Sequence, residues 1–449
     1  GYMSFSFAMA QKTDPLLTVI KEKLGDDYLK FLSIDTNPGT TQIKNSKPDI
    51  QTFETMVASI QNIMEKSPIP AFIGSNSWVI SSKKTSTGSV LFANDPHIGF
   101  SQPSVWYEAH ISTPNYEMYG YHIAGVPFPL LGHNRHFAYG ITMFENDDID
   151  FYKEENNPTE ENQYKTENGF STYETTKKTI KVKDAEDVTI EVKSSRHGPI
   201  MNNTVDAISE SQPIAMSWIY TQFEIKGLEA LYTISRAEKM EDVKKGASMI
   251  HAPGLNIMYG DAKGNIAWWA TGRLPIRDSS VNAKSILDGS NPNHNIKSYV
   301  SFVNNPQMIN PKSGVIITAN NLPTANKIEG IPRLDGYFRS TDRAQRIYSL
   351  LDKQETWSTE ELKKVQNDDF LISSLNLNHE IIASLNTQIK KFSTIETTAF
   401  KLLKQWDGNM PIDSKGNSIF QLTIYHILKE ALEPNLGKDY FRIYMNNVL

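Results

Sequence analysis

A run of strand-like segments with helical patterns on both sides constrains the fold of this chain most strongly. Between residue 71 and about residue 192, short apolar segments recur at strand length and are separated by turn residues. The polar residues 184–187 lie between two alternating segments and predict an antiparallel hairpin. The clearest predicted strands cover residues 78–80, 90–92, 105–107, 137–139, 180–182 and 188–192.

Helical patterns occupy both ends of the chain. Asp14 followed by Pro15 is typical of a helix start, and Gly25 of a helix end. Ser358 and Glu361 predict a capping box. Helices, then antiparallel strands, then helices predict a layered α+β domain. Helices are also predicted for residues 53–64, 228–250 and most of the last 50 residues, and a hairpin for residues 256–269.

Composition excludes several classes of protein. The 449 residues carry a net charge of −6, which argues against a dedicated nucleic-acid binder, and we expect no nucleic-acid partner. The chain contains no cysteine, so disulfide scaffolds, thiol nucleophiles and iron–sulfur sites are excluded. No apolar stretch approaches the roughly 20 residues that span a bilayer, so we expect no membrane insertion. The first residues show no signal peptide, and we expect native residues upstream of them.

The segment from Ile73 to Trp78 contains the dipeptide Gly74-Ser75 where a loop enters a strand. A serine hydroxyl that follows glycine can attack the preceding carbonyl, because glycine imposes no side-chain obstruction. Hydrolysis of the resulting ester would leave Ser75 as a new N-terminus. Its α-amino group, with a reference pKa of about 7.7–8.0, would then act as general base for its own hydroxyl. Taken alone, the motif favours an ordinary serine before a strand, because short motifs are weak signals.

Three further polar segments are candidate sites. Residues 94–97 (Asn-Asp-Pro-His) follow a predicted strand, where His97 could orient a nucleophile, although the segment alone predicts a turn. Residues 146–150 contain three aspartates, hard oxygen ligands of the kind that calcium binds, and they equally fit a solvated acidic turn. Asn256 could donate to an oxyanion or be a structural amide at a strand edge.

Together, these segments resemble the penicillin acylase family of N-terminal nucleophile hydrolases. The resemblance rests on ordered motifs over most of the chain. They are Gly74-Ser75-Asn76-x-Trp78, residues 94–97, Gly132-His133-Asn134, residues 147–150, His197-Gly198-Pro199, Asp261-x-x-Gly264-Asn265-Ile266, residues 318–321, Arg343-x-x-Arg346-Ile347 and residues 406–408. It implies a four-layer αββα fold, in which antiparallel sheets are sandwiched between helices.

The resemblance also implies catalytic roles. Ser75 is expected to be the nucleophile, freed by self-cleavage between Gly74 and Ser75. Asn256 and the backbone N–H of Met143 are expected to form the oxyanion hole. His97 is expected to help hold the nucleophile, and Arg277 to lie near the oxyanion asparagine.

Metal, substrate and domain assignments follow from the same resemblance. Asp147, Asp150 and the carbonyl of Ile149 are expected to hold a structural calcium ion, and no organic cofactor is expected. Asp14 is expected either to complete that site or to cap its helix. The expected acyl pocket is apolar and is lined by Ile98, Leu131 and Ile141.

The resemblance implies that residues 1–74 are the end of an α-chain with its linker, and that residues 75–449 begin a β-chain. The two would form a heterodimer after processing. We expect an amidohydrolase that acts on a small N-acyl amide of the penicillin, cephalosporin or acyl-homoserine-lactone type. The resemblance implies a periplasmic or secreted bacterial protein. Two alternatives remain open: a non-catalytic binding protein, and a metal-dependent hydrolase that uses Asp95, His97, Asp147 and Asp150.

Overall fold

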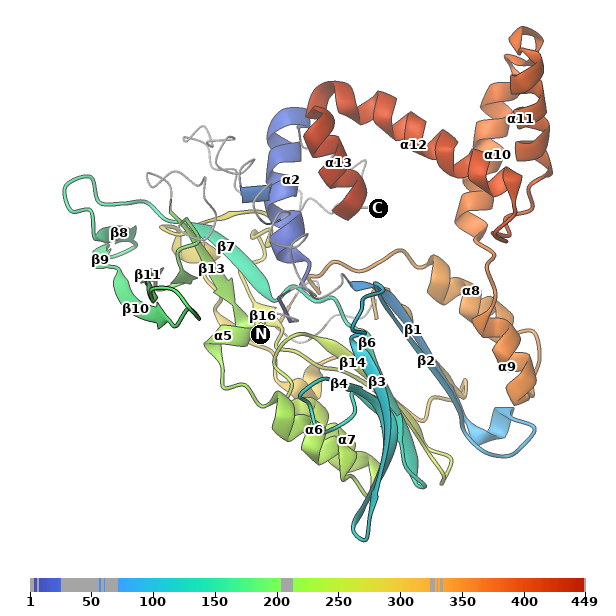
Figure 1. Ribbon diagram of the computed structural model, residues 1–449, viewed down its shortest axis with the longest axis horizontal. Coiled ribbons are helices and arrows are strands. Elements are labelled where there is room, and N and C mark those ends of the chain that lie inside the picture. Colours follow the sequence, from blue (N-terminus) through green and yellow to red (C-terminus); the bar gives the residue numbers. More distant parts are fainter. Residues whose placement is uncertain are drawn as a thin grey trace.

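The computed structural model describes residues 4–5, 8–25, 56–57, 60, 72–202, 213–323, 328, 330–331 and 334–447. Two antiparallel sheets lie face to face, and helices cover their outer faces (Figure 1). This arrangement confirms the expected four-layer αββα architecture. Within the described ranges, no helix is long and apolar enough to cross a membrane.

The two central sheets contain most of the long strands. The first has the strand order β2-β1-β20, and the second has the order β19-β15-β14-β6-β5-β4-β3. Their bounds are β1 (Phe72–Ile80), β2 (Leu91–Ile98), β20 (Val315–Thr318), β3 (Trp106–Thr113), β4 (Tyr116–Ile123), β5 (Leu131–His133), β6 (Phe137–Met143), β14 (Leu255–Asp261), β15 (Ile266–Ala270) and β19 (Gln307–Ile309).

Side chains of the central strands alternate between separate cores, as the two-residue period of a strand requires. The core between the sheets includes Val79, Met258, Trp268 and Ile316. Their chain neighbours point the opposite way. Trp78, Ile80, Val315 and Ile317 pack outward against one helical layer, and Ile257, Tyr259 and Trp269 pack outward against the other.

Each outer layer contains a pair of helices. Helix α8 (Asp342–Leu351) and helix α9 (Thr359–Gln366) cover the first sheet, through Ala344, Ile347 and Leu362. Helix α6 (Gly227–Ser235) and helix α7 (Met240–Ser248) cover the second sheet, through Ile234 and Val243. Because α8 packs beside β20, side chains at the start of α8 reach the start of β1.

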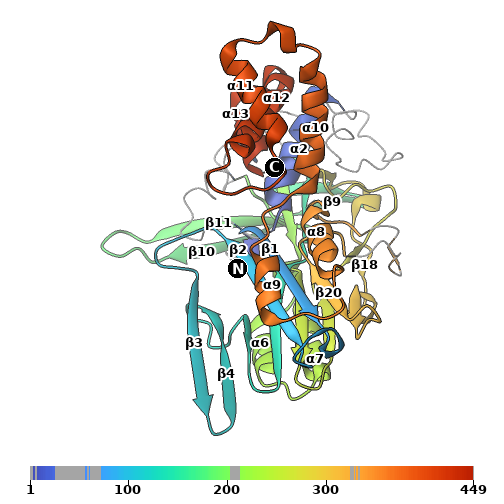
Figure 2. The same cartoon turned by 90° about the vertical axis from the view of Figure 1, so that its right-hand side faces the viewer.

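A third sheet, β13-β7-β17, lies beside the central layers and packs against helix α2 (Ala10–Leu24). Helices α12 and α13 share an apolar core with α2. Figure 2 shows the hairpins β3–β4 and β10–β11 extending from the body. The remaining bounds are β7 (Ile149–Lys153), β8 (Gln163–Thr166), β9 (Gly169–Thr172), β10 (Glu174–Ile180), β11 (Val188–Ser195), β12 (Gly198–Pro199), β13 (Ile214–Trp218), α5 (Ile219–Gln222), β16 (Pro275–Ile276), β17 (Leu287–Asp288), β18 (Ser298–Tyr299), α10 (Ile372–Asn386), α11 (Thr394–Gln405), α12 (Lys415–Leu436) and α13 (Lys438–Asn447).

Most predicted strands are present, and several boundaries differ. Helix α2 begins at Ala10 rather than at Asp14, so Pro15 lies inside the helix and Gly25 ends it. Asp14 therefore does not cap this helix. The long helix predicted for residues 228–250 is two helices, and the polar segment 94–97 lies inside β2 rather than after a strand. Of the helix predicted for residues 53–64, only residues 56, 57 and 60 lie among the described residues, and they are helical.

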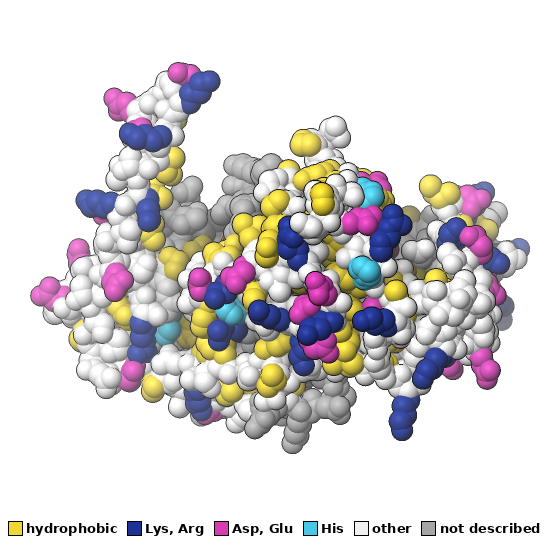
Figure 3. Space-filling model, turned by 90° about the horizontal axis from the view of Figure 1, so that it is seen from below, with side chains coloured by type: hydrophobic (Ala, Val, Ile, Leu, Met, Phe, Trp, Pro, Cys, Tyr) yellow, Lys and Arg dark blue, Asp and Glu magenta, His cyan; other side chains and the backbone are white. Residues whose placement is uncertain are grey.

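The surface mixes both signs of charge. On the face shown in Figure 3, Lys and Arg side chains are interspersed with Asp and Glu and with apolar side chains. That face carries no broad cationic patch of the kind that tracks a nucleic-acid backbone.

Candidate active site

Ser75 lies near the start of β1 and is 1% exposed. Its strand pairs with β2 on one side, where Ser75 lies opposite Pro96. On the other side, pairing with β20 begins only at Ser77, opposite Thr318. The start of β1 therefore extends past β20, and the residues just after β20 can turn in to meet it.

Asn320 is the residue that turns in. Its side-chain Nδ2 donates to Ser75 Oγ at 3.1 Å, and its Oδ1 accepts from the Ser75 N–H at 2.7 Å. The backbone N–H of Met143, the last residue of β6, donates to the same Oγ at 3.2 Å. Two donors thus converge on the serine oxygen. Asn320 has a φ of +61°, a left-handed conformation that asparagine tolerates better than most residues.

Arg343, near the start of α8, contacts the backbone of the nucleophile. Its Nη1 donates to the Ser75 carbonyl at 2.7 Å and to Asn76 Oδ1 at 2.6 Å. Its Nη2 donates to Asn320 Oδ1 at 3.0 Å. Burial lowers the pKa of Arg343, and the Glu145 carboxylate opposes that effect. One guanidinium therefore links the nucleophile to the asparagine that contacts it.

Asn256, the expected oxyanion donor, makes no described hydrogen bond to Ser75. Asn256 Nδ2 donates to Thr142 Oγ1 at 3.0 Å and to the Met143 carbonyl at 3.1 Å, and its Oδ1 accepts from Trp268 Nε1 at 2.9 Å. Asn256 therefore braces the strand that carries the Met143 N–H. The sequence signal for Asn320 was the motif Thr-Ala-Asn-Asn directly after an apolar strand.

Arg277 lies in the buried acidic cluster. It follows β16, and its Nη2 contacts both carboxylate oxygens of Asp150, at 2.8 and 2.7 Å. The arginine that contacts the nucleophile is Arg343.

His97 lies in β2 directly opposite Gly74. A Cβ atom on Gly74 would come within 3.4–3.5 Å of the side chains of Arg343, Asn320 and His97. Three polar side chains therefore lie beside Gly74. His97 Nε2 lies 2.7 Å from Asp95 Oδ2 on the same strand.

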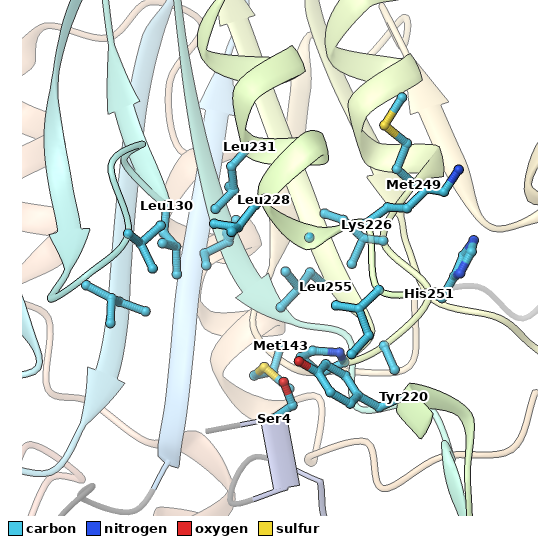
Figure 4. A pocket seen from close by; sticks show the side chains of 18 of the residues that line it. Ser4, Leu130, Met143, Tyr220, Lys226, Leu228, Leu231, Met249, His251 and Leu255 are labelled. Atoms are coloured by element: carbon cyan, nitrogen blue, oxygen red, sulfur yellow. The ribbon is translucent and has the colours of Figure 1, made fainter. Parts of the chain in front are cut away.

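A cavity of about 390 Å³ opens beside Ser75. Ile98 and Ile141 line it as expected, whereas Leu130 lines it in place of Leu131. The shift by one residue arises because successive side chains at the start of β5 point to opposite faces. In Figure 4, Leu228 and Leu231 of α6 lie near Leu130, and Met143, Ser4 and Tyr220 lie together at the opposite part of the cavity. The wall is mostly apolar, with Glu224, Lys226 and His251 at one part of its lining.

The acidic segment 146–150 is buried rather than solvated. Asp147 is 1% and Asp150 2% exposed, and Ile149 is the fully buried first residue of β7. Asp14 from α2 lies in the same cluster, where Tyr337 donates to its Oδ1. Burial raises the pKa of Asp14 and of Asp147 well above the usual range of a carboxyl. Burial by itself would lower the pKa of Arg277. The carboxylates of Asp150 and Asp147 together have a larger effect in the opposite direction, so the pKa of Arg277 is raised.

The donor atoms of this cluster fit a hard divalent cation. Both oxygens of Asp147 and Oδ2 of Asp14 are buried without a hydrogen-bond partner. Carboxylate oxygens of this kind are what calcium binds. Asp150, in contrast, is already held by Arg277, and among the described residues no three acidic or histidine side chains converge as a formed metal site.

Glu145 is a further buried acid that sequence reasoning missed. Its φ of +58° is unusual for a residue other than glycine, and neither carboxylate oxygen has a hydrogen-bond partner. Burial raises the pKa of Glu145 to about 7, against the opposing charges of Arg339, Arg343 and Lys12. Burial likewise lowers the pKa of Lys12 to about 8. Arg339, one of these charged residues, is in contact with Asn320. Its backbone N–H donates to the Asn320 carbonyl at 2.7 Å.

Sequence comparison finds bacterial relatives of this chain. Acyl-homoserine lactone acylase QuiP of Pseudomonas aeruginosa is 24% identical over 97% of this chain and 54% of its own length. Penicillin acylase 2 proenzyme of Pseudomonas sp. (strain SE83) is 24% identical over 77% of this chain and 44% of its own. The chain thus spans about half the length of the relatives that it matches.

The fold has a solved counterpart. The structure of thermostable penicillin G acylase from Alcaligenes faecalis superposes with a TM-score of 0.70 at 21% identity, over 82% of this chain and 67% of that chain. The sequence model of the family described as penicillin amidase matches residues 1–448. This chain therefore belongs to the penicillin amidase family.

Proposed function

We propose that this chain carries the catalytic centre of an amidohydrolase that removes an apolar acyl group from an N-acyl compound. The observation that carries the proposal is the environment of Ser75. Its Oγ accepts hydrogen bonds from the Met143 N–H and from Asn320 Nδ2 at the wall of an apolar cavity. A hydroxyl flanked by two donors and an acyl-sized cavity is suited to acyl transfer.

Catalysis would begin with self-cleavage between Gly74 and Ser75. Ser75 Oγ attacks the Gly74 carbonyl, the acyl group moves from nitrogen to oxygen, and water hydrolyses the ester. The Ser75 N–H already donates to Asn320 Oδ1, and the same contact would orient the liberated amine. The expected product is a heterodimer of an α-chain ending at Gly74 and a β-chain beginning at Ser75.

The mature reaction would use Ser75 as both nucleophile and base. Its α-amine takes the hydroxyl proton while Oγ attacks the amide carbonyl of the substrate. The Met143 N–H and Asn320 Nδ2 stabilise the tetrahedral oxyanion, each contributing about 3 kcal/mol or more to the barrier reduction. The proton then passes to the leaving amine, and water releases the acyl group by the same steps.

The substrate class follows from the cavity and from the names of the relatives. Relatives named for penicillin and for acyl-homoserine lactone both hydrolyse amides, so we propose an N-acyl substrate of one of these kinds. Ile98, Ile141 and Leu231 favour an aliphatic or aromatic acyl group over a charged one, since a bare charge would lose hydration there.

The experiment is acyl release from a panel of N-acyl-homoserine lactones of increasing chain length and from penicillin G, comparing the wild type with Ser75→Ala. We expect amide hydrolysis by the wild type and none by Ser75→Ala. Ser77→Ala is the matched control: Ser77 lies two residues further along β1 and only bonds to the Ala93 carbonyl, so it should keep activity. Hydrolysis that survives Ser75→Ala would contradict the proposal.

We further propose that Asp14, Asp147, Asp150 and the Ile149 carbonyl hold calcium, which would tie α2 to β7 and take no part in the chemistry. The unpartnered oxygens of Asp14 and Asp147 support this proposal. Calcium should raise the melting temperature of the wild type after chelator treatment, but not that of Asp147→Asn. An equal response of the two proteins would contradict it.

The bacterial relatives support a periplasmic or secreted location, which fractionation of the native host would test.

A further inference from the structure

Arg343 supplies the one charged side chain among the hydrogen bonds described for Ser75 and Asn320. Its Nη1 donates to the Ser75 carbonyl at 2.7 Å, and its Nη2 donates to Asn320 Oδ1 at 3.0 Å. The same Oδ1 accepts from the Ser75 N–H at 2.7 Å. The guanidinium and the Ser75 nitrogen are therefore at most two hydrogen-bond lengths apart.

This guanidinium also decides which way the Asn320 amide faces. A guanidinium contains only donors, so the amide atom that it holds must be the oxygen. The Nδ2 group is then left to face Ser75 Oγ, to which it donates at 3.1 Å. Arg343 thus places the Asn320 donor that we propose for the oxyanion.

The other charged groups around Arg343 come from three parts of the fold. Glu145 lies just after β6, Arg339 lies before α8, and Asp95 lies on β2. Burial lowers the pKa of Arg343; Glu145 and Asp95 oppose that effect, and Arg339 adds to it. The ordinary pKa of arginine, above about 12, keeps the side chain charged near neutral pH. His97 lies against Asp95 and adds a further positive charge when it is protonated.

We propose that Arg343 is a positioning residue that keeps the freed Ser75 amine unprotonated near neutral pH and holds Asn320 toward the reacting oxygen. The inference rests on the proposed function. The amine must accept the Oγ proton as Oγ bonds to the substrate carbonyl carbon, and an amine that is already protonated cannot accept it. A positive charge within about 4–6 Å disfavours a second one, and such neighbours commonly move a pKa by about 1–3 units.

The first experiment measures the acid limb of the pH–rate profile, because kcat/KM falls as the amine of the free enzyme becomes protonated. Loss of the charge in Arg343→Gln should raise the pKa of the amine and move the acid limb by about one pH unit to higher pH. Arg343→Lys keeps the charge and loses part of the hydrogen bonding, so its acid limb should stay near that of the wild type while kcat falls. A purely structural role would lower kcat in both variants without separating their pH profiles.

Arg346→Gln is the matched control. Arg346 lies about one turn further along α8, and its guanidinium contacts both carboxylate oxygens of Asp368, each at 2.7 Å. The variant therefore removes the same charge from the same helix without touching a described contact of Ser75. Its acid limb should coincide with that of the wild type. Each protein is assayed only after intact-mass spectrometry shows that the bond between Gly74 and Ser75 is cleaved.

The second experiment titrates the amine without any substrate. In mature protein labelled with ¹⁵N-serine, the Ser75 nitrogen is an amine, whereas serine nitrogens within a chain are amides, so its ¹⁵N NMR signal stands apart. In the wild type we expect a titration midpoint below the reference range of about 7.7–8.0 for an α-amine. The midpoint should rise by about one pH unit in Arg343→Gln and stay at the wild-type value in Arg343→Lys and Arg346→Gln.

A wild-type midpoint at or above that reference range would overturn the inference without any variant. Equal acid limbs in the wild type and Arg343→Gln would overturn it too. So would an Arg343→Gln protein that folds and never cleaves, because Arg343 would then belong to the cleavage chemistry. Wild-type protein that neither cleaves nor hydrolyses an N-acyl compound would instead contradict the proposed function, and the inference would fall with it.

Discussion

Asn320 contributes more contacts to the nucleophile than any other side chain described around it. It bonds both the N–H and the Oγ of Ser75, and its Nδ2 also reaches the Met143 carbonyl at 3.0 Å. Asn256 Nδ2 donates to that same carbonyl, and Asn256 makes no described contact with Ser75. Both asparagines thus contact the Met143 carbonyl. Asn320 also contacts Ser75 Oγ, whereas Asn256 contacts Thr142 and Met143 of β6.

Asn320→Ala should therefore lower kcat for amide hydrolysis by about 10²–10³-fold, the usual cost of removing one oxyanion donor. Asn256→Ala should lower kcat less than 10-fold and act mainly on stability, by about 1–3 kcal/mol, because it leaves Trp268 Nε1 without its acceptor. Steady-state kinetics and denaturant unfolding of both variants check this difference. If Asn256→Ala lowers kcat more than Asn320→Ala does, Asn256 and not Asn320 is the oxyanion donor.

Glu145 makes stability depend on pH. Its pKa is raised to about 7 in the folded protein, so the folded state binds this proton more tightly than the unfolded chain, where a glutamate has a pKa of about 4.3. The contribution of Glu145 to stability is therefore fully present below about pH 4 and is lost as the pH rises toward 7.

Glu145→Gln should remove that dependence. Between pH 5 and 7.5, the free energy of unfolding of the variant should rise by about 2 kcal/mol relative to the wild type. Urea unfolding at several pH values within this window measures the difference. Parallel curves for the two proteins would show that the Glu145 carboxyl titrates alike in the folded and unfolded states.

At the scale of elements, α8 connects the outer helical layer to the active site. One face of the helix packs Ala344, Ile347 and Leu351 against β1 and β20, and its start carries Arg343 to Ser75. The helix therefore fixes the position of the guanidinium through apolar packing several residues away.

Leu351→Ala should lower the free energy of unfolding by about 2–5 kcal/mol, the range for a buried leucine replaced by alanine. Leu351 is 2% exposed, whereas Gln345 on the same helix is exposed. Gln345→Ala is the matched control and should change stability by less than about 0.5 kcal/mol. Chemical unfolding of both variants measures the effect. Equal stabilities would mean that α8 is not anchored by this core.

Elements with local signals were predictable from the sequence. The hairpins at residues 184–187 and 263–265 have polar turn residues, and the capping box at Ser358 is present as expected. The break within residues 228–250 was missed, because its cap is atypical. The Asp242 side chain reaches back to the backbone N–H groups of Glu238 and Lys239, and no serine or threonine marks the start of α7.

At the scale of the whole molecule, the active site joins four distant parts of the chain. Residues 75, 143, 320 and 343 come from β1, β6, the turn after β20, and α8. Sequence motifs pointed to Ser75 and Met143, and the structure brings the Met143 N–H to Ser75 Oγ. They did not predict that Asn320 and Arg343 contact Ser75, because those contacts depend on how β20 and α8 pack beside β1. The burial of residues 146–150 escaped sequence reasoning for the same reason: solvent-exposed and buried aspartates have the same local pattern.

The central claim is that Ser75 becomes an N-terminal nucleophile. Intact-mass spectrometry of the purified protein, with N-terminal sequencing of its fragments, tests this claim most directly. The account predicts two chains, one ending at Gly74 and one beginning at Ser75, and a single uncleaved chain for Ser75→Ala. An unbroken bond between Gly74 and Ser75 in protein that hydrolyses the amide would contradict it.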